Sequence, residues 1–255
     1  MDSILWQLPI ADLAVIAVSA FVAGISSGMT GFGGGLLLPP ILAPFIGVQN
    51  VMPVLSVAML ITNCHRFGLY YRHLDRRLTL IVLAAMIPAV IIGTTIYLAL
   101  PYQAIAAVLG SFLLLSVPFG RFLSRRKMQL GPVGLAGFSA GFGIISGTTS
   151  GSGVLMVPVL LGAGLAGVTF LATDAAISIA INLTRAGMFG QAGNLPTELL
   201  ITAVMIGLCT IPGNYVARWL LRRTSLRVHV QIMEGVVIIG GLSLLWAPVR
   251  GLFAT

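Results

Sequence analysis

Apolar residues run along nearly the whole chain in stretches close to the length at which an α-helix crosses a bilayer. The stretches are separated by short polar or glycine- and proline-containing turns. The pattern predicts segments at 10–29, 33–48, 51–70, 78–100 and 103–122, and then at 132–149, 153–163, 166–188, 198–221 and 230–248. The second segment of each set is short for a full span, so a half-helix or a re-entrant limb is expected there. We therefore expect an all-α polytopic membrane protein with about eight to ten transmembrane or re-entrant helices.

The two sets of segments are copies of one another. Residues 24–40 are GISSGMTGFGGGLLLPP and residues 143–159 are GIISGTTSGSGVLMVPV. Seven positions of the first block (Gly24, Ser27, Gly28, Thr30, Gly34, Leu36 and Pro39) recur at a constant offset of 119 residues. The same offset pairs Asn63 with Asn182 and Arg66 with Arg185. We divide the chain into a first repeat, 1–130, and a second repeat, 131–255, which together form one membrane domain.

The basic residues predict that the two repeats have opposite orientations. Most of the 14 Lys and Arg residues fall into three clusters, near residues 66–77, 121–127 and 218–227, and each cluster closes an apolar span. Such clusters mark the cytoplasmic ends of spans. The third segment of the first repeat ends at a basic loop, whereas residues 190–197, after the third segment of the second repeat, carry no Lys or Arg. Inverted repeats are typical of secondary transporters that bind substrate where the repeats meet.

Composition excludes several other classes. Hydrophobic residues make up 58% of the 255 residues and charged residues 8%, too few charges for the surface of a soluble domain. The net charge of +8 lies at span ends without interleaved aromatic residues, so no nucleic-acid partner is expected. Cys64 and Cys209 have no metal-ligand spacing, and no metal or cofactor is expected. Without a Ser-His-Asp set, an HExxH motif or paired carboxylates in the spans, we expect no enzymatic activity.

The glycine-rich blocks are the first candidates for a binding site, and two interpretations are open. Glycines spaced by four residues allow close helix packing. Consecutive glycines also break helices, and a broken helix can present free backbone N–H groups and nearby hydroxyls to an anion. On the second interpretation the candidate substrate-binding residues are Gly28, Thr30, Gly31, Gly33 and Gly34, with Gly147, Thr148, Thr149, Ser150, Gly151 and Ser152 in the second copy.

Polar residues inside the spans are the second set of candidates, because charge in a membrane segment generally marks a site or a pathway. Arg185 could grip an oxyanion through two N–H groups, and Asn182 lies one helical turn earlier. Alternatively, Arg185 extends to the outer interface. Arg66 and Asn63 are the repeat mates of this pair, although Arg66 could instead begin the cytoplasmic cluster.

Two further residues are candidates for coupling transport to an ion gradient. His65 could titrate near neutral pH, or be structural at a helix end. Asp174 is a carboxylate in an apolar span whose repeat mate is Leu55. It could couple to protons or cap a half-helix. A direct pair with Arg185 is not expected, because the two lie about 16 Å apart along one helix.

The duplicated glycine motif with its following proline, and the basic loop near residues 72–77, resemble the TauE/SafE sulfite exporter family along essentially the whole chain. The second copy departs from the pattern at Ser150, Ser152 and Val154. The resemblance implies a multi-pass protein of the bacterial inner membrane that exports small sulfur-containing anions such as sulfite or organosulfonates, driven by an ion gradient. The expected partners are a small anion and the lipid bilayer. The sequence leaves open whether the protein forms a homodimer. The alternatives are an anion channel or permease for another small anion and a membrane-embedded enzyme.

Overall fold

The protein is helical throughout the residues that the structure describes. A computed structural model describes residues 9–125 and 131–220, with Ile238 and Leu242 beyond them. The expected segment 230–248 therefore lies almost wholly outside the described residues. The described helices are α1 (Ile10–Thr30), α2 (Gly33–Ile46), α3 (Val48–Tyr70), the short η2 (Tyr71–His73), α4 (Arg76–Ala99), α5 (Tyr102–Arg125), α6 (Pro132–Thr148), α7 (Gly153–Gly162), α8 (Gly167–Gln191) and α9 (Thr197–Leu220).

The hydropathy pattern predicted these boundaries closely. All nine described segments begin and end within three residues of the expected positions. Five helices, α1, α4, α5, α8 and α9, are long and apolar enough to cross a membrane by length and composition. Large apolar side chains such as Leu80 and Leu115 are 67% and 64% exposed on the surface of the bundle. Such a surface suits lipid rather than water, and the chain is a multi-pass membrane protein.

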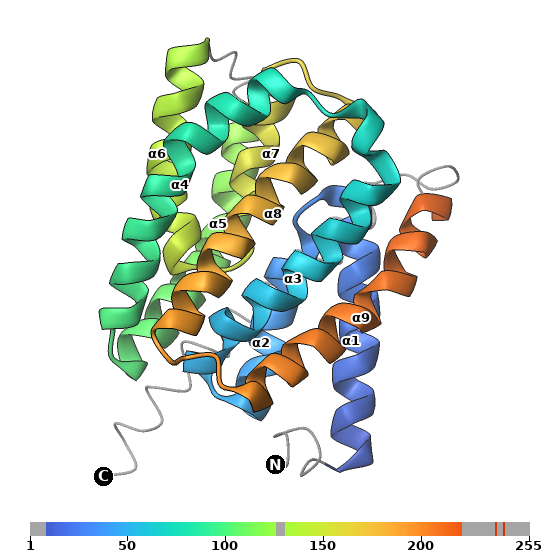
Figure 1. Ribbon diagram of the computed structural model, residues 1–255, viewed down its shortest axis with the longest axis vertical. Helices are drawn as coiled ribbons and strands as arrows, with labels where there is room; N and C mark the ends of the chain where they lie inside the picture. The colour runs from blue at the N-terminus through green and yellow to red at the C-terminus, as the bar shows by residue number, and fades with distance from the viewer. Residues whose placement is uncertain (1–8, 126–130, 221–237, 239–241, 243–255) are drawn as a thin grey trace.

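The two glycine-rich helix pairs form hairpins that enter the molecule from opposite ends. In Figure 1, α1 rises from the lower end and α2 returns to it, whereas α6 descends from the upper end and α7 returns upward. The turn between α1 and α2 depends on Gly31, whose φ of +91° favours glycine. Helices α3 and α8 then run in opposite directions side by side through the middle. The repeats are inverted, and the short second segments turn back rather than continue across.

Each repeat packs its first helix against the fourth helix of the other repeat: α1 against α9, and α6 against α4. Glycines allow the helices to approach closely. A Cβ atom on Gly24 would lie 2.2 Å from the Thr210 carbonyl oxygen, and one on Gly93 would lie 2.2 Å from the Ile144 carbonyl oxygen. Gly28 and Gly147 lie in the same two contacts. The repeats are therefore interlocked through backbone contacts that side chains would block.

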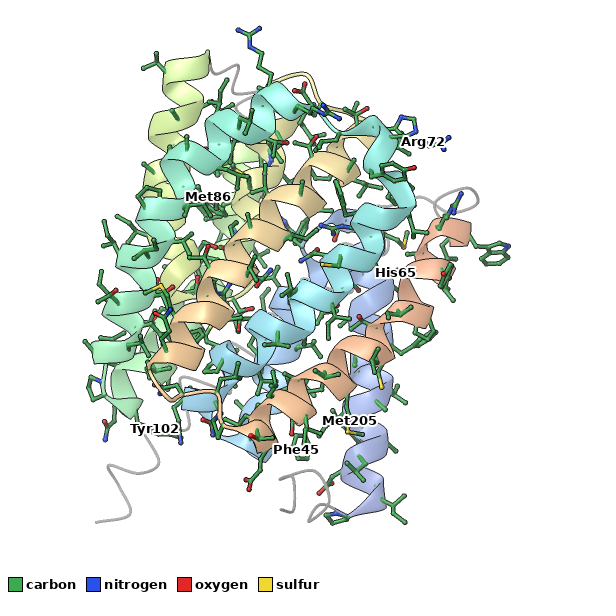
Figure 2. All side chains as sticks on the ribbon, viewed as in Figure 1. Phe45, His65, Arg72, Met86, Tyr102 and Met205 are labelled. Carbon is green, nitrogen blue, oxygen red and sulfur yellow. The ribbon has the colours of Figure 1, made fainter. Side chains whose placement is uncertain are left out.

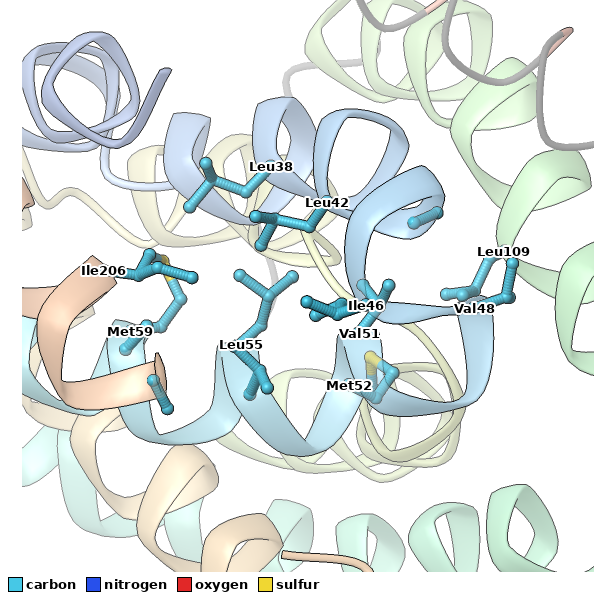
Figure 3. Packing of buried hydrophobic residues seen from close by; sticks show 14 of the residues in the cluster. Leu38, Leu42, Ile46, Val48, Val51, Met52, Leu55, Met59, Leu109 and Ile206 are labelled. Atoms are coloured by element: carbon cyan, nitrogen blue, oxygen red, sulfur yellow. The ribbon is translucent and has the colours of Figure 1, made fainter. Parts of the chain in front are cut away.

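The buried apolar residues form two clusters that position α3 and α8. One cluster joins α2, α3, α5 and α9, with Leu38, Leu42 and Leu55 among its members (Figure 3). The other joins α4, α6, α7 and α8. Tightly packed clusters leave few voids, so the polar side chains between α3 and α8 are held in fixed positions.

Basic side chains gather at one end of the molecule. The η2 turn and the last residues of α5 and α9 all lie toward the upper part of Figure 1, and Figure 2 shows Arg72 there. The α4–α5 and α8–α9 connections lie at the lower end, where Figure 2 labels Tyr102. This distribution is the one that the positive-inside rule associates with a cytoplasmic upper end.

Candidate functional site

The tips of the two hairpins meet in the middle of the molecule. A Cβ atom on Gly35 would lie 2.7 Å from the backbone nitrogen of Gly151, and one on Gly153 would lie 3.0 Å from Cβ of Phe32. Glycine is therefore needed at Gly35 and Gly151 for the two helix breaks to approach each other. Their contact brings the hydroxyl-rich break of the second repeat, 149–152, next to the start of α2.

A cavity of about 60 Å³ lies beside this contact and between α3 and α8. At about 30 Å³ of liquid volume per water molecule, it has room for about two waters. Both repeats line it: Ser27, Gly31, Phe32, Gly35, Met59 and Asn63 from the first, and Phe142, Ser146, Ser150, Gly151, Ser152, Gly153, Met156, Asp174, Ile177, Ser178, Ile181, Asn182 and Arg185 from the second. Hydroxyls, amides and one guanidinium face apolar walls, which is the composition of a site for a small polar ligand.

Arg66 is fully buried and closes the end of α1. Its Nη1 donates to the carbonyl oxygens of Ser27, at 2.8 Å, and Gly31, at 2.7 Å. Its Nη2 forms an ion pair with the carboxylate of Asp174 on α8. The Ser27 carbonyl also accepts from the Gly31 N–H, 2.9 Å away, so the guanidinium adds a second donor there and ties the first hairpin to the second repeat.

This arrangement corrects two interpretations from the sequence. Arg66 is not part of the exposed basic cluster, because its side chain points into the bundle and is 0% exposed. Asp174 does not cap a half-helix, because α8 already begins at Gly167 and continues past it to Gln191. Its carboxylate is instead the counter-charge of Arg66.

Arg185 is also buried, at 4% exposed, but has no such partner. Its one hydrogen bond is from Nη2 to the sulfur of Met52, 3.0 Å away, and its Nε has no partner. Sulfur is a weak acceptor. The side chain faces the cavity rather than extending to the interface, so the alternative of an interfacial arginine is wrong. Among the described residues no carboxylate forms an ion pair with Arg185.

The cavity brings together some of the other predicted site residues. Asn63 and Asn182 both line it. The Asn182 amide donates to the Ser178 carbonyl of its own helix, 2.8 Å away, and Asn63 Oδ1 has no partner. Gly31, Ser150, Gly151 and Ser152 line the cavity as well.

The remaining predicted residues lie elsewhere. The hydroxyls of Thr30, Thr148 and Thr149 bond to carbonyls of the preceding turn of their own helices. Gly28 and Gly147 lie in helix contacts, and a Cβ on Gly34 would meet the sulfur of Met59. His65 packs on Tyr215 of α9 with ring centroids 4.7 Å apart, and its Nδ1 is 3.4 Å from the Asn214 amide nitrogen. Gly33 begins α2 and is buried, outside the cavity lining.

Ser178 and the apolar walls of the cavity are site features that were not predicted from the sequence. Ser178 lies four residues after Asp174 and four before Asn182, so helical spacing places all three on one face. The spacing could therefore have predicted Ser178 as a site residue. Met59, Met156 and Phe142 carry no sequence signal that separates a cavity wall from an ordinary core. Among the described residues no group of three or more His, Cys, Asp or Glu side chains could hold a metal ion.

Two inverted helical repeats with a polar cavity at their interface are an arrangement typical of membrane transporters. The family described as sulfite exporter TauE/SafE matches residues 16–244, and the chain belongs to this family of membrane transporters. Comparisons with curated proteins and with solved structures found no match.

Proposed function

We propose that this protein is a secondary transporter that exports small sulfur-containing oxyanions, sulfite first among them, across a bacterial inner membrane. One observation carries the proposal: Arg185 is buried between the repeats, faces the cavity and has no carboxylate partner among the described residues. A buried charge without a counter-charge is costly. An anion from solution would supply that counter-charge.

The lining suits an oxyanion. Arg185 offers N–H donors in a planar fork, and Ser146, Ser150 and Ser152 offer hydroxyl donors around the same cavity. Asp174 also lines the cavity, but its charge is engaged by Arg66. A cavity volume of about 60 Å³ supports a compact ligand.

The inverted repeats support transport by alternating access, in which one repeat rocks against the other around the bound anion. The gradient that drives export is part of the proposal, with Asp174 and His65 as its coupling residues. In support of this role, Asp174 lines the cavity, whereas His65 packs on Tyr215 of α9.

The direct test is uptake of radiolabelled sulfite into proteoliposomes, with and without a pH gradient. Arg185→Ala should lower the initial rate by about tenfold or more, because charge-assisted hydrogen bonds to the anion are lost. Arg185→Lys should retain part of the rate, since the charge remains without the fork. Arg72→Ala is the matched control: Arg72 is exposed in η2, so this variant should transport sulfite as the wild type does.

Counterflow separates a carrier from the alternative of an anion channel. Unlabelled sulfite inside the vesicles should accelerate uptake of labelled sulfite through a carrier, and no such acceleration is expected through a channel. Wild-type rates in Arg185→Ala would overturn the assignment of the anion site. Failure of the wild type to transport sulfite under any gradient would overturn the assignment of sulfite as the substrate.

A further inference from the structure

Helices α3 and α8 each carry an arginine at the equivalent repeat position, but the residue eleven positions before the arginine differs between them. Arg66 follows Leu55 in α3, and Arg185 follows Asp174 in α8. Eleven residues make about three helical turns, so each pair lies on one face of its helix. Because the repeats are inverted, the face of α3 meets the face of α8 with the two helices running in opposite directions.

The register between these helices is fixed by one observed contact. Arg66 of α3 reaches Asp174 of α8. The repeat symmetry then places Arg185 of α8 at the level of Leu55 in α3. The observed contact of Arg185 is with Met52, which precedes Leu55 by one helical turn. The two arginines are therefore equivalent in repeat position, and among the described residues Arg66 alone has a carboxylate partner.

We infer that Asp174 is a tethered anion, and that the residue at positions 174 and 55 decides which arginine receives the transported ion. The carboxylate of Asp174 occupies Arg66, so the anion site forms at Arg185, for which the repeat symmetry gives Leu55 as the counterpart of Asp174. This inference rests on the proposed function and adds two specificity-determining positions to it. Leu55 is 1% exposed and does not line the cavity. It is therefore identified by the repeat symmetry and not by contact with the anion.

The placement of the cavity supports the asymmetry. Arg185 and Asp174 line the cavity, whereas Arg66 lies behind Asp174 and is 0% exposed. Arg66 has two carbonyl acceptors and a carboxylate, and Arg185 has one sulfur acceptor. Removing the Asp174 carboxylate would open a path from the cavity to a second guanidinium.

The first test places a carboxylate opposite Arg185. Leu55→Asp should weaken sulfite binding to the purified protein by about tenfold or more relative to Leu55→Asn, because the new carboxylate competes for the guanidinium. Asparagine is the matched control, with nearly the same shape and no charge. Leu55→Asp should also melt at a higher temperature than Leu55→Asn, since only the carboxylate can pair with Arg185. Equal sulfite affinity in the two variants would overturn the inference.

The second test uses the other helix and does not depend on Leu55. Asp174→Ala should bind two sulfite ions per chain where the wild type binds one, and sulfite should raise its melting temperature more than that of the wild type. Adding Arg66→Met to Asp174→Ala should abolish the extra ion. One ion per chain in Asp174→Ala would overturn the inference. Loss of sulfite binding by the wild type itself would instead contradict the proposed function, so the two failures are distinguishable.

Discussion

At the scale of residues, the site contrasts an arginine that has a carboxylate partner with an arginine that has none among the described residues. Arg66 binds a carboxylate and two helix-end carbonyls, and it contributes structure. Within the described part of the chain, the sulfur of Met52 is the one hydrogen-bond acceptor of Arg185, and the Nε atoms of both arginines have no partner. The same side chain at repeat-related positions thus serves packing in one repeat and is available for binding in the other. The difference arises from the residue on the facing helix.

The ion pair predicts non-additive effects on stability. Breaking a buried pair from one side leaves an uncompensated charge and costs about 3–5 kcal/mol. Arg66→Met and Asp174→Ala should each lower the melting temperature in detergent, and the double variant should lose less than the sum of the two. Arg185→Met with Asp174→Ala is the control pair, and its effects should add, because these residues form no ion pair. Additive losses for Arg66 and Asp174 would contradict a direct interaction.

At the scale of elements, the contacts of α1 with α9 and of α6 with α4 depend on glycines that face backbone. The Cβ of an alanine at Gly24 would lie 2.2 Å from the carbonyl oxygen of Thr210, a rigid neighbour. Similar contacts surround Gly143 and Gly213. These helices cannot separate by a few tenths of an ångström without affecting the hairpin tips, since α1 and α6 lead directly into them.

Gly24→Ala is therefore expected to destabilise the protein by about 1–3 kcal/mol, the usual cost of overpacking. Gly68→Ala in α3 is the matched control, because its Cβ would meet nothing within 4 Å. Alanine there should be neutral or slightly stabilising, since glycine disfavours helix. Melting temperatures of the purified variants would measure both. Equal stability of Gly24→Ala and Gly68→Ala would show that the α1–α9 contact can relax.

At the scale of the whole molecule, the distribution of basic residues predicts orientation. Connections at the lower end of Figure 1 should face the outside of the cell and η2 the cytoplasm. In a variant without its native cysteines, Asn194→Cys should react with an impermeant maleimide in intact cells, because Asn194 is exposed between α8 and α9. His73→Cys, exposed in η2, should react only after permeabilisation. The reverse pattern would contradict the proposed direction of insertion.

The sequence predicted the helices well because each depends on local information. The length of an apolar run and its bounding Gly, Pro or basic residues determine a span such as α4 or α9 without reference to the rest of the chain. The inverted repeat was also visible, since Asn63 and Arg66 recur in register.

The pairing inside the site was harder to predict. Arg66 and Asp174 are 108 residues apart and lie on different helices. Their contact depends on the register at which α3 crosses α8, and hydropathy does not determine that register. The repeat offset limits the possible registers, because each contact between α3 and α8 implies a symmetry-related second contact. At least one contact must be observed before this relation can be used.

The exchange of helix partners between the repeats has a consequence for biosynthesis. The glycine-lined face of α1 meets α9 only after nearly the whole chain has been translated, and α4 must likewise await α6. At about 5–20 residues per second, the interval for α1 is on the order of ten seconds or more. The nascent first repeat therefore has to persist in the bilayer with its tightest contacts unmade. The helices that complete the packing of the first repeat have not yet been synthesised at that stage.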